Sequence, residues 1–158
     1  KDTIPRRICK KYLNENSNIE YSIIEMNEMT LYGKCIKTDL ANIGKVAPEF
    51  CDNFNKEYEE KYGHFDYAAT IYESRFDSQQ CEYWISYINK IDGFTPIIIP
   101  KSKWLKFKIN STIGNDIQNV VKIFYEKFLP STKYKIKPIP ELEYYHENTA
   151  ELLIPIED

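Results

Sequence analysis

Histidine, glycine and closely spaced cysteines are scarce in this sequence. Among 158 residues there are two His, five Gly and four Cys, the last at positions 9, 35, 51 and 81. No two cysteines have C-x-x-C spacing, and neither His64 nor His146 lies near a cysteine, so we expect no bound metal and no other cofactor. Two histidines also give little scope for a Ser-His-Asp or Cys-His catalytic centre.

Long apolar runs and a secretory signal are missing too. The longest apolar segment is far too short to span a bilayer, and the first residues do not form a signal peptide. We therefore expect a cytoplasmic protein with reduced thiols rather than a secreted one with two disulfides. The first residue is Lys1 rather than Met, as expected for a fragment of a longer chain.

Positive charge is sparse beyond the first residues. The formal net charge is −3, but KDTIPRRICKK at the start carries +4, which leaves −7 for the remainder. An acidic body disfavours nucleic-acid binding by this chain alone. We interpret residues 1–18 as a basic linker or tail. Its positive charge would also suit the junction with a neighbouring DNA-binding domain.

Aromatic side chains are plentiful and follow a repeated pattern. Of the residues, 15% are aromatic, and 13 of them are Tyr, which suits both strand faces and half-wet binding clefts. Each half of residues 19–158 reads strand, strand, helix, strand, strand. The expected strands are 19–26, 29–38, 67–74 and 81–88, then 94–100, 103–109, 140–147 and 150–156. The expected helices begin at 42–44 and 113–114 and end before Gly63 and at Leu129-Pro130, with Pro48 in the first turn of the first helix.

The shared order and the Ile-Gly start of both helices indicate an internal duplication, with halves at about 19–91 and 92–158. We predict an α+β fold of duplicated ββαββ-type halves related by a pseudo-twofold axis. In this fold an antiparallel sheet carries two helices on one face and a central ligand cleft on the other.

Five short motifs in the C-terminal half occur in order at suitable spacing. They are YWISYI from Tyr83, Ile99-Pro100 leading to Trp104, Gly114 to Gln118 at the helix start, Leu129-Pro130 at its end, and AELLIPI from Ala150 to Ile156. In these motifs the sequence resembles the GyrI-like effector-binding domain. That domain occurs in the C-terminal part of AraC-type transcription regulators, in MerR-type multidrug regulators and in free-standing proteins related to the gyrase inhibitor.

Three positions depart from the family pattern. Ser86 stands where the family usually has Gly, Ala150 replaces a usual Tyr, and Leu153 replaces a usual aromatic residue. Because these positions lie on or near the expected cleft wall, they predict a ligand different from those of better-matching relatives.

Glu151 opens the last apolar strand, where its charge needs a partner or water. The resemblance implies that this glutamate lies at the floor of the cleft and pairs with a cationic ligand. A carboxylate among aromatic walls is poorly solvated and favours a cation that brings an apolar body. Cation–π attraction adds about 0.5–2 kcal/mol per aromatic face. The alternative is a solvated glutamate at a strand end, paired with a Lys.

Strand alternation selects the companions of Glu151. Leu153 shares its face, whereas Leu152, Ile154 and Ile156 should face the helices. Trp84 lies on the more polar face of its strand, and Trp104 alternates against Leu105 and Phe107. Tyr67 and Tyr72 have opposite parity, so at most one of them lines the cleft of a regular strand. The predicted ligand-binding residues are Glu151, Trp84, Trp104, Tyr67, Tyr72 and Leu153.

The sequence and the resemblance together favour a ligand-sensing domain of a bacterial transcription regulator of the AraC family, capable of multidrug recognition. Its ligand would be a lipophilic cation, it would contact DNA only through a separate domain absent from this chain, and it would bind no membrane and catalyse no reaction. The alternative is a free-standing GyrI-like protein. Such a protein would bind a protein partner such as gyrase, sequester toxic compounds, or hydrolyse a reactive small molecule with Glu151 activating a water.

Overall fold

The computed structural model describes residues 20–72 and 80–158. The basic segment at 1–18, Cys9, and most of the turn between the third and fourth strands lie outside the described residues. The elements are β1 (Glu20–Met26), β2 (Met29–Asp39), α2 (Ile43–Tyr62), β3 (Tyr67–Tyr72), β4 (Gln80–Tyr87), β5 (Thr95–Ile99), β6 (Ser102–Ile109), α3 (Gly114–Ile123), the π-helical turn η1 (Phe124–Phe128), the 3₁₀ turn η2 (Leu129–Ser131), β7 (Glu141–Tyr145) and β8 (Ala150–Ile156). The α+β class and the repeated ββαββ order are confirmed.

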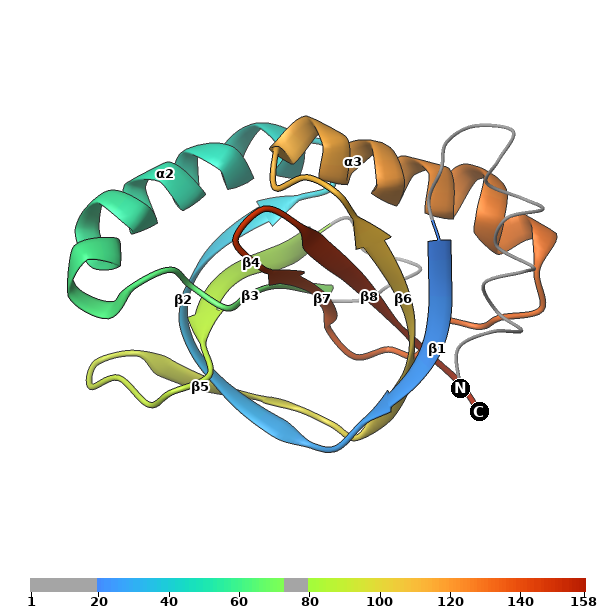
Figure 1. Cartoon of the computed structure of the whole chain (residues 1–158), viewed down its shortest axis with the longest axis horizontal. Helices are drawn as coiled ribbons and strands as arrows, with labels where there is room; N and C mark the ends of the chain where they lie inside the picture. The colour runs from blue at the N-terminus through green and yellow to red at the C-terminus, as the bar shows by residue number, and fades with distance from the viewer. Residues whose placement is uncertain (1–19, 73–79) are drawn as a thin grey trace. The chain divides into compact units, whose positions relative to one another are not determined.

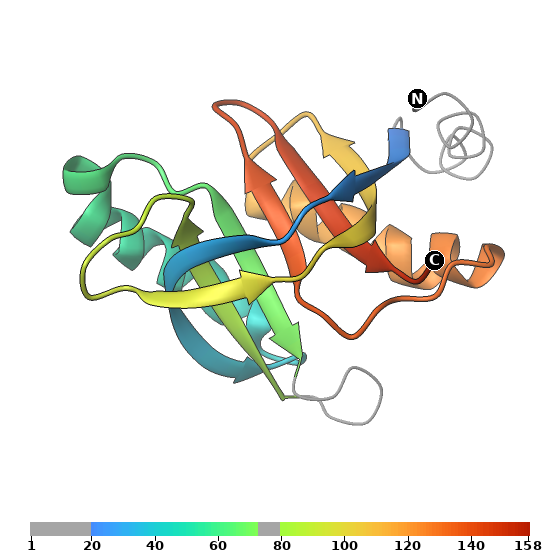
Figure 2. The ribbon, with the colours of Figure 1, turned by 90° about the horizontal axis from the view of Figure 1, so that it is seen from below.

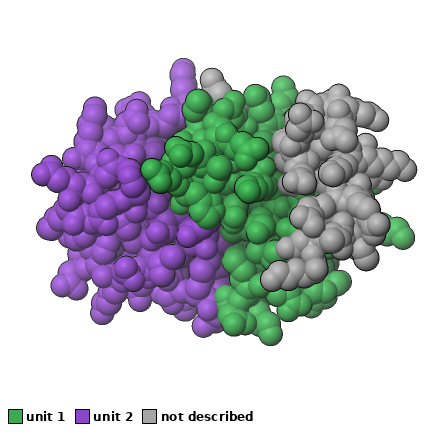
Figure 3. Space-filling model, in the orientation of Figure 1, with its two compact units in different colours: residues 1–27, 101–137, 145–158 green, residues 28–100, 138–144 purple. Residues whose placement is uncertain are grey.

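The chain divides into two compact units, coloured separately in Figure 3. Unit 1 contains residues 1–27, 101–137 and 145–158, and unit 2 contains residues 28–100 and 138–144. The strand order is β1-β6-β8 in unit 1 and β7-β3-β4-β2-β5 in unit 2. Each pair of neighbouring strands within a unit is antiparallel.

Each compact unit contains strands from both halves of the sequence. Strand β1, from the first half, pairs with β6 of the second, with Ile24 opposite Trp104. Strand β5, from the second half, pairs reciprocally with β2, with Tyr32 opposite Pro96. Figure 2 shows both pairs, β1 beside β6 and β5 beside β2. The two compact units are therefore not the two contiguous halves 19–91 and 92–158. That these halves arose by duplication stays a prediction.

In unit 1, α3 and η1 cover one face of the three strands (Figure 1). Phe107 of β6 packs its ring 5.5 Å from that of Phe124 and 5.3 Å from that of Phe128. The helix ends where it was expected: the N–H of Leu129 donates to the carbonyl of Phe124, five residues back, and Pro130 follows. The buried core on this face is made of Tyr21, Leu105, Phe107, Ile109, Ile117, Val120, Phe124, Phe128, Ile136, Ala150, Leu152, Ile154 and Ile156.

In unit 2, α2 covers one face of its strands through an aromatic cluster. Phe54 is buried and lies 5.9 Å from Tyr87 of β4 and 6.2 Å from Phe94, between ring centroids. The helix ends as expected at Gly63, whose φ of 81° suits glycine and whose N–H donates to the carbonyl of Glu59.

The position expected for Pro48 is wrong. Helix α2 begins at Ile43, so Pro48 is its sixth residue and lies in the second turn. A proline there leaves the carbonyl of Gly44 without its helical hydrogen bond. Both residues are exposed, so water can satisfy that carbonyl at little cost.

Gly33 of β2 has no room for a side chain. A Cβ built at Gly33 would lie 2.4 Å from the backbone oxygen of Ile85 on β4, whereas one at Gly44 would meet nothing within 4 Å. We expect Gly33→Ala to lower the free energy of unfolding by about 1–3 kcal/mol, because two paired strands must separate. The control Gly44→Ala should raise it by up to about 0.5 kcal/mol. Urea unfolding of both variants measures this, and equal stabilities would refute the close approach of β2 and β4.

Tyr87 carries a pH dependence of stability. Burial, with the nearby carboxylates of Asp66 and Glu59, raises its pKa to about 12, and its hydroxyl donates to the carbonyl of Gly63 at 2.8 Å. In the unfolded chain the tyrosine ionises near pH 10, so its stabilising contribution is full below pH 10 and is lost as the pH rises towards 12. We expect Tyr87→Phe to cost about 1 kcal/mol at pH 7 and to flatten the decline between pH 10 and 12. Identical pH profiles of melting temperature for wild type and variant would contradict this.

Candidate ligand-binding site

Glu151 lies on the face of unit 1 that α3 does not cover. Along β8, Leu152, Ile154 and Ile156 belong to the core against α3, so Glu151, Leu153 and Pro155 point to the opposite face. The alternation expected for this strand is therefore confirmed. On β6, Leu105 and Phe107 likewise face α3, which places Trp104, Lys106 and Lys108 on the side of Glu151.

The pairing of β6 and β8 sets the order of side chains on this face. Glu151 is opposite Lys108, Leu153 is opposite Lys106, and Pro155 is opposite Trp104. Directly opposed residues of an antiparallel pair share a face and lie about 4.5–5.5 Å apart. The face therefore changes from charged side chains at Glu151 to apolar ones at Pro155 and Trp104.

Glu151 already has two partners. Its Oε2 lies 3.2 Å from Nε2 of His146 and 4.0 Å from Nζ of Lys106. The exposed fractions of the side chains are 22% for Glu151, 43% for His146 and 30% for Lys106, so water screens the pairs only in part. A neutral His146 that donates from Nε2 makes a hydrogen bond here, and a protonated one makes an ion pair.

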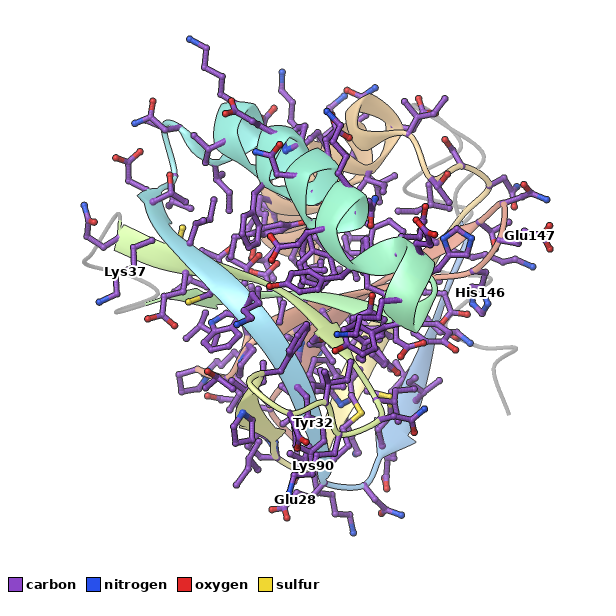
Figure 4. The ribbon with its side chains drawn as sticks, turned by 90° about the vertical axis from the view of Figure 1, so that its left-hand side faces the viewer. Glu28, Tyr32, Lys37, Lys90, His146 and Glu147 are labelled. Atoms are coloured by element: carbon purple, nitrogen blue, oxygen red, sulfur yellow. The ribbon has the colours of Figure 1, made fainter. Side chains whose placement is uncertain are left out.

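A tight turn brings His146 to Glu151. The backbone N–H of His146 donates to the carbonyl of Thr149 at 2.9 Å, which folds the chain back between β7 and β8. Figure 4 labels His146 and its neighbour Glu147 in this turn. Sequence reasoning considered a generic Lys partner for Glu151 but missed His146. The available signal was the short polar stretch HENT between two strands, which is typical of a turn.

Trp104 and Leu153 are buried beside this charged cluster. Trp104 is 0% exposed and Leu153 is 1% exposed. The indole N–H of Trp104 has no hydrogen-bond partner among the described residues. A buried donor without a partner costs about 1–3 kcal/mol in desolvation.

In unit 2, Trp84 and Tyr67 share a face of the strands and Tyr72 does not. Tyr83 and Tyr87 pack against α2, so Trp84 points to the opposite face, where its N–H donates to Oε1 of Glu82 at 2.9 Å. Tyr67 is opposite Ser86, which has the parity of Trp84. Tyr72 is opposite Cys81, which has the parity of Tyr83, so Tyr72 belongs to the α2 side.

The structure thus groups the six predicted residues by unit. Glu151, Leu153 and Trp104 share one face in unit 1, Trp84 and Tyr67 share one face in unit 2, and Tyr72 lies on the other face of its strand. Their roles in ligand binding stay predictions. Across residues 20–72 and 80–158, no group of three or more His, Cys, Asp or Glu side chains could hold a metal ion. None of the helices described is long and apolar enough to cross a membrane.

Solved structures with the same fold come from bacterial proteins of several kinds. A putative transcription regulation protein of Staphylococcus aureus matches with a TM-score of 0.72 and 15% identity over 88% of this chain and 99% of that chain. The protein SAV2435, solved bound to tetraphenylphosphonium, matches with a TM-score of 0.67 and 13% identity over 87% of this chain and 94% of that chain. An integron cassette protein of Vibrio cholerae matches with a TM-score of 0.67 and 16% identity over 89% of this chain and 100% of that chain. At these identities the likeness establishes the fold alone.

No curated protein matches this sequence significantly. The family described as integron-associated effector-binding protein, Cass2, matches residues 22–156, which contain every strand and helix described except the first two residues of β1. The resemblance to the GyrI-like effector-binding domain is confirmed by this match and by the shared fold. From Ser22 to Ile156, this chain belongs to the Cass2 family of integron-associated effector-binding proteins.

Proposed function

We propose that this domain binds a lipophilic cation on the face of unit 1 that carries Glu151. One observation carries the proposal: a carboxylate whose side chain is only 22% exposed stands on the same face as the buried Trp104 and Leu153. Such a site rewards a ligand that brings both positive charge and apolar surface. Family membership and the tetraphenylphosphonium bound to SAV2435 support it.

The partners of Glu151 set the condition that a ligand must meet. Ion pairs between partly exposed side chains contribute only about 0–1 kcal/mol, so Lys106 holds the carboxylate weakly and can return its ammonium group to water. A cation with an apolar body excludes water as it binds, which strengthens its attraction to the carboxylate. The ligand therefore replaces a weak internal pair with a stronger, less solvated one.

We further propose that ligand binding serves transcription regulation. The C-terminal domain of EcmrR shares the fold with a TM-score of 0.56. EcmrR has also been solved in a complex with DNA, and this chain covers 62% of the EcmrR chain in that complex. DNA contact by this protein would come from a separate DNA-binding domain. An AraC-type regulator is one form of this proposal, and a free-standing protein that sequesters toxic compounds is the alternative to it. An in-frame helix-turn-helix domain in the upstream gene sequence would distinguish the two.

Glu151→Gln tests the role of the charge. We expect the affinity for tetraphenylphosphonium, measured by calorimetry, to fall about tenfold to a hundredfold, because the charge-assisted contact is lost while the shape is kept. Affinity for neutral triphenylphosphine should hardly change. The melting temperature should move little, because the ion pairs lost are weak.

The control for this variant is Glu157→Gln, which removes the same charge from an exposed residue just beyond β8. It should leave cation affinity intact. Unchanged cation affinity in Glu151→Gln would refute the proposed site. A substrate turned over by wild type and bound but not turned over by Glu151→Gln would instead favour the hydrolase alternative.

Lys106→Gln tests the competition for Glu151. Removing the internal cation should strengthen tetraphenylphosphonium binding by about twofold to fivefold, in keeping with a weak pair. Lys103→Gln is the matched control: it removes the same charge from the same strand, but Lys103 has the parity of Leu105 and Phe107 and lies near Asp158. Weaker cation binding in Lys106→Gln than in Lys103→Gln would show that Lys106 supports the ligand rather than competing with it.

A further inference from the structure

We propose that His146 makes cation binding at Glu151 depend on pH: a protonated His146 competes with the ligand for the carboxylate, and a neutral one does not. The inference rests on the proposed function and adds a means of regulation to the same site. Cation affinity then rises with pH across the range in which histidine loses its charge, and binding within that range is accompanied by proton release.

The first observation is the geometry at the carboxylate of Glu151. Nε2 of His146 and Nζ of Lys106 approach the same oxygen, Oε2, at 3.2 and 4.0 Å. A ligand cation drawn to this oxygen therefore meets both groups. The side chain of His146 is 43% exposed and that of Glu151 is 22% exposed, so water, protons and a ligand at the surface can all reach the pair.

The second observation concerns the other charged groups near this pair. Ordinary carboxylates stay ionised and ordinary lysines stay protonated from about pH 5.5 to 8, whereas histidine is the residue type that changes charge there. Lys106 and Lys108 of β6 share the face of Glu151, and the residue opposite Lys106 on β1 is the uncharged Ser22. Glu147 follows His146 in the turn and is exposed (Figure 4). Among these described neighbours, a change of charge near neutral pH therefore belongs to His146.

Protonation of His146 acts on a cationic ligand in two ways. The imidazolium forms an ion pair with Glu151 that the ligand must break, and it repels a second cation placed at the same oxygen. A neutral imidazole does neither. Water screens both effects because the pair is partly exposed, so the change in affinity is modest, about threefold to tenfold. By linkage, a proton that weakens ligand binding is itself released when the ligand binds.

The test measures the affinity of tetraphenylphosphonium as a function of pH by calorimetry. This ion has no titratable proton, so any pH dependence comes from the protein. We expect wild type to bind it about threefold to tenfold more weakly at about pH 5.5 than at about pH 7.5, while neutral triphenylphosphine binds equally at both. Near pH 6.5, titrations in two buffers of different ionisation enthalpy should show release of up to about half a proton per cation bound.

Three substitutions separate His146 from the rest of the chain. His146→Gln keeps a hydrogen-bond donor for Glu151 but cannot become charged, so it should lose the pH dependence. His146→Lys carries a fixed charge and should bind the cation weakly throughout. Both keep the backbone N–H that donates to Thr149 in the turn. The matched control is His64→Gln, because His64 is the other histidine and pairs with Glu59 instead; it should retain the wild-type pH dependence.

The outcomes distinguish this inference from the proposed function. A tetraphenylphosphonium affinity that does not change with pH, or a pH dependence that survives in His146→Gln, would overturn the inference and leave the cation site standing. Proton uptake on binding would overturn it as well. Failure of the ion to bind folded wild-type protein at any pH would overturn the proposed function and the inference with it.

Discussion

The packing of α3 and η1 against β6 and β8 is the constraint on which the candidate site depends. Phe107, Phe124 and Phe128 fill the space between helix and strands, so every second residue of both strands is committed to that core. The remaining side chains, Glu151 among them, have only the other face to occupy. A shift of one residue in the register would bury Glu151 under the helix, at a large cost in free energy. The hydrophobic core thus fixes the face of the strands on which Glu151 lies.

The carboxylate of Glu151 has polar side chains close to it before any ligand binds. The ammonium of Lys106 balances its charge in part and Nε2 of His146 lies within hydrogen-bond distance of its Oε2, which lowers the cost of keeping a partly buried carboxylate on this face. The side chain of Lys106 is 30% exposed, and its Nζ lies 4.0 Å from Oε2 of Glu151, so this ion pair contributes little stability. In the proposed function, a cationic ligand would displace this weak pair, while the pair lowers the cost of the carboxylate when no ligand is bound.

The reciprocal pairing of β1 with β6 and of β5 with β2 gives the duplicated fold a further property. Each compact unit contains strands from both sequence halves, so neither half can complete its own sheet alone. Long-range strand pairing of this kind costs more chain entropy than local hairpins do. Folding of unit 1 therefore requires residues from Tyr21 to Ile156, most of the length matched by the family.

The sequence by itself determined the strands, the helices and the faces of β6 and β8, because period-2 and period-3.6 patterns are local properties. Local rules also separated Tyr67 from Tyr72. The start of α2 was predicted correctly, but Pro48 is the sixth residue of that helix and so lies in the second turn rather than the first. Tertiary structure alone decided that His146 reaches Glu151, that Trp104 lacks a hydrogen-bond partner while Trp84 has Glu82, and that the two halves exchange β1 and β5. These features depend on which strands pair and in which register, and pairing is settled by the free energy of the whole core rather than by any short stretch of residues.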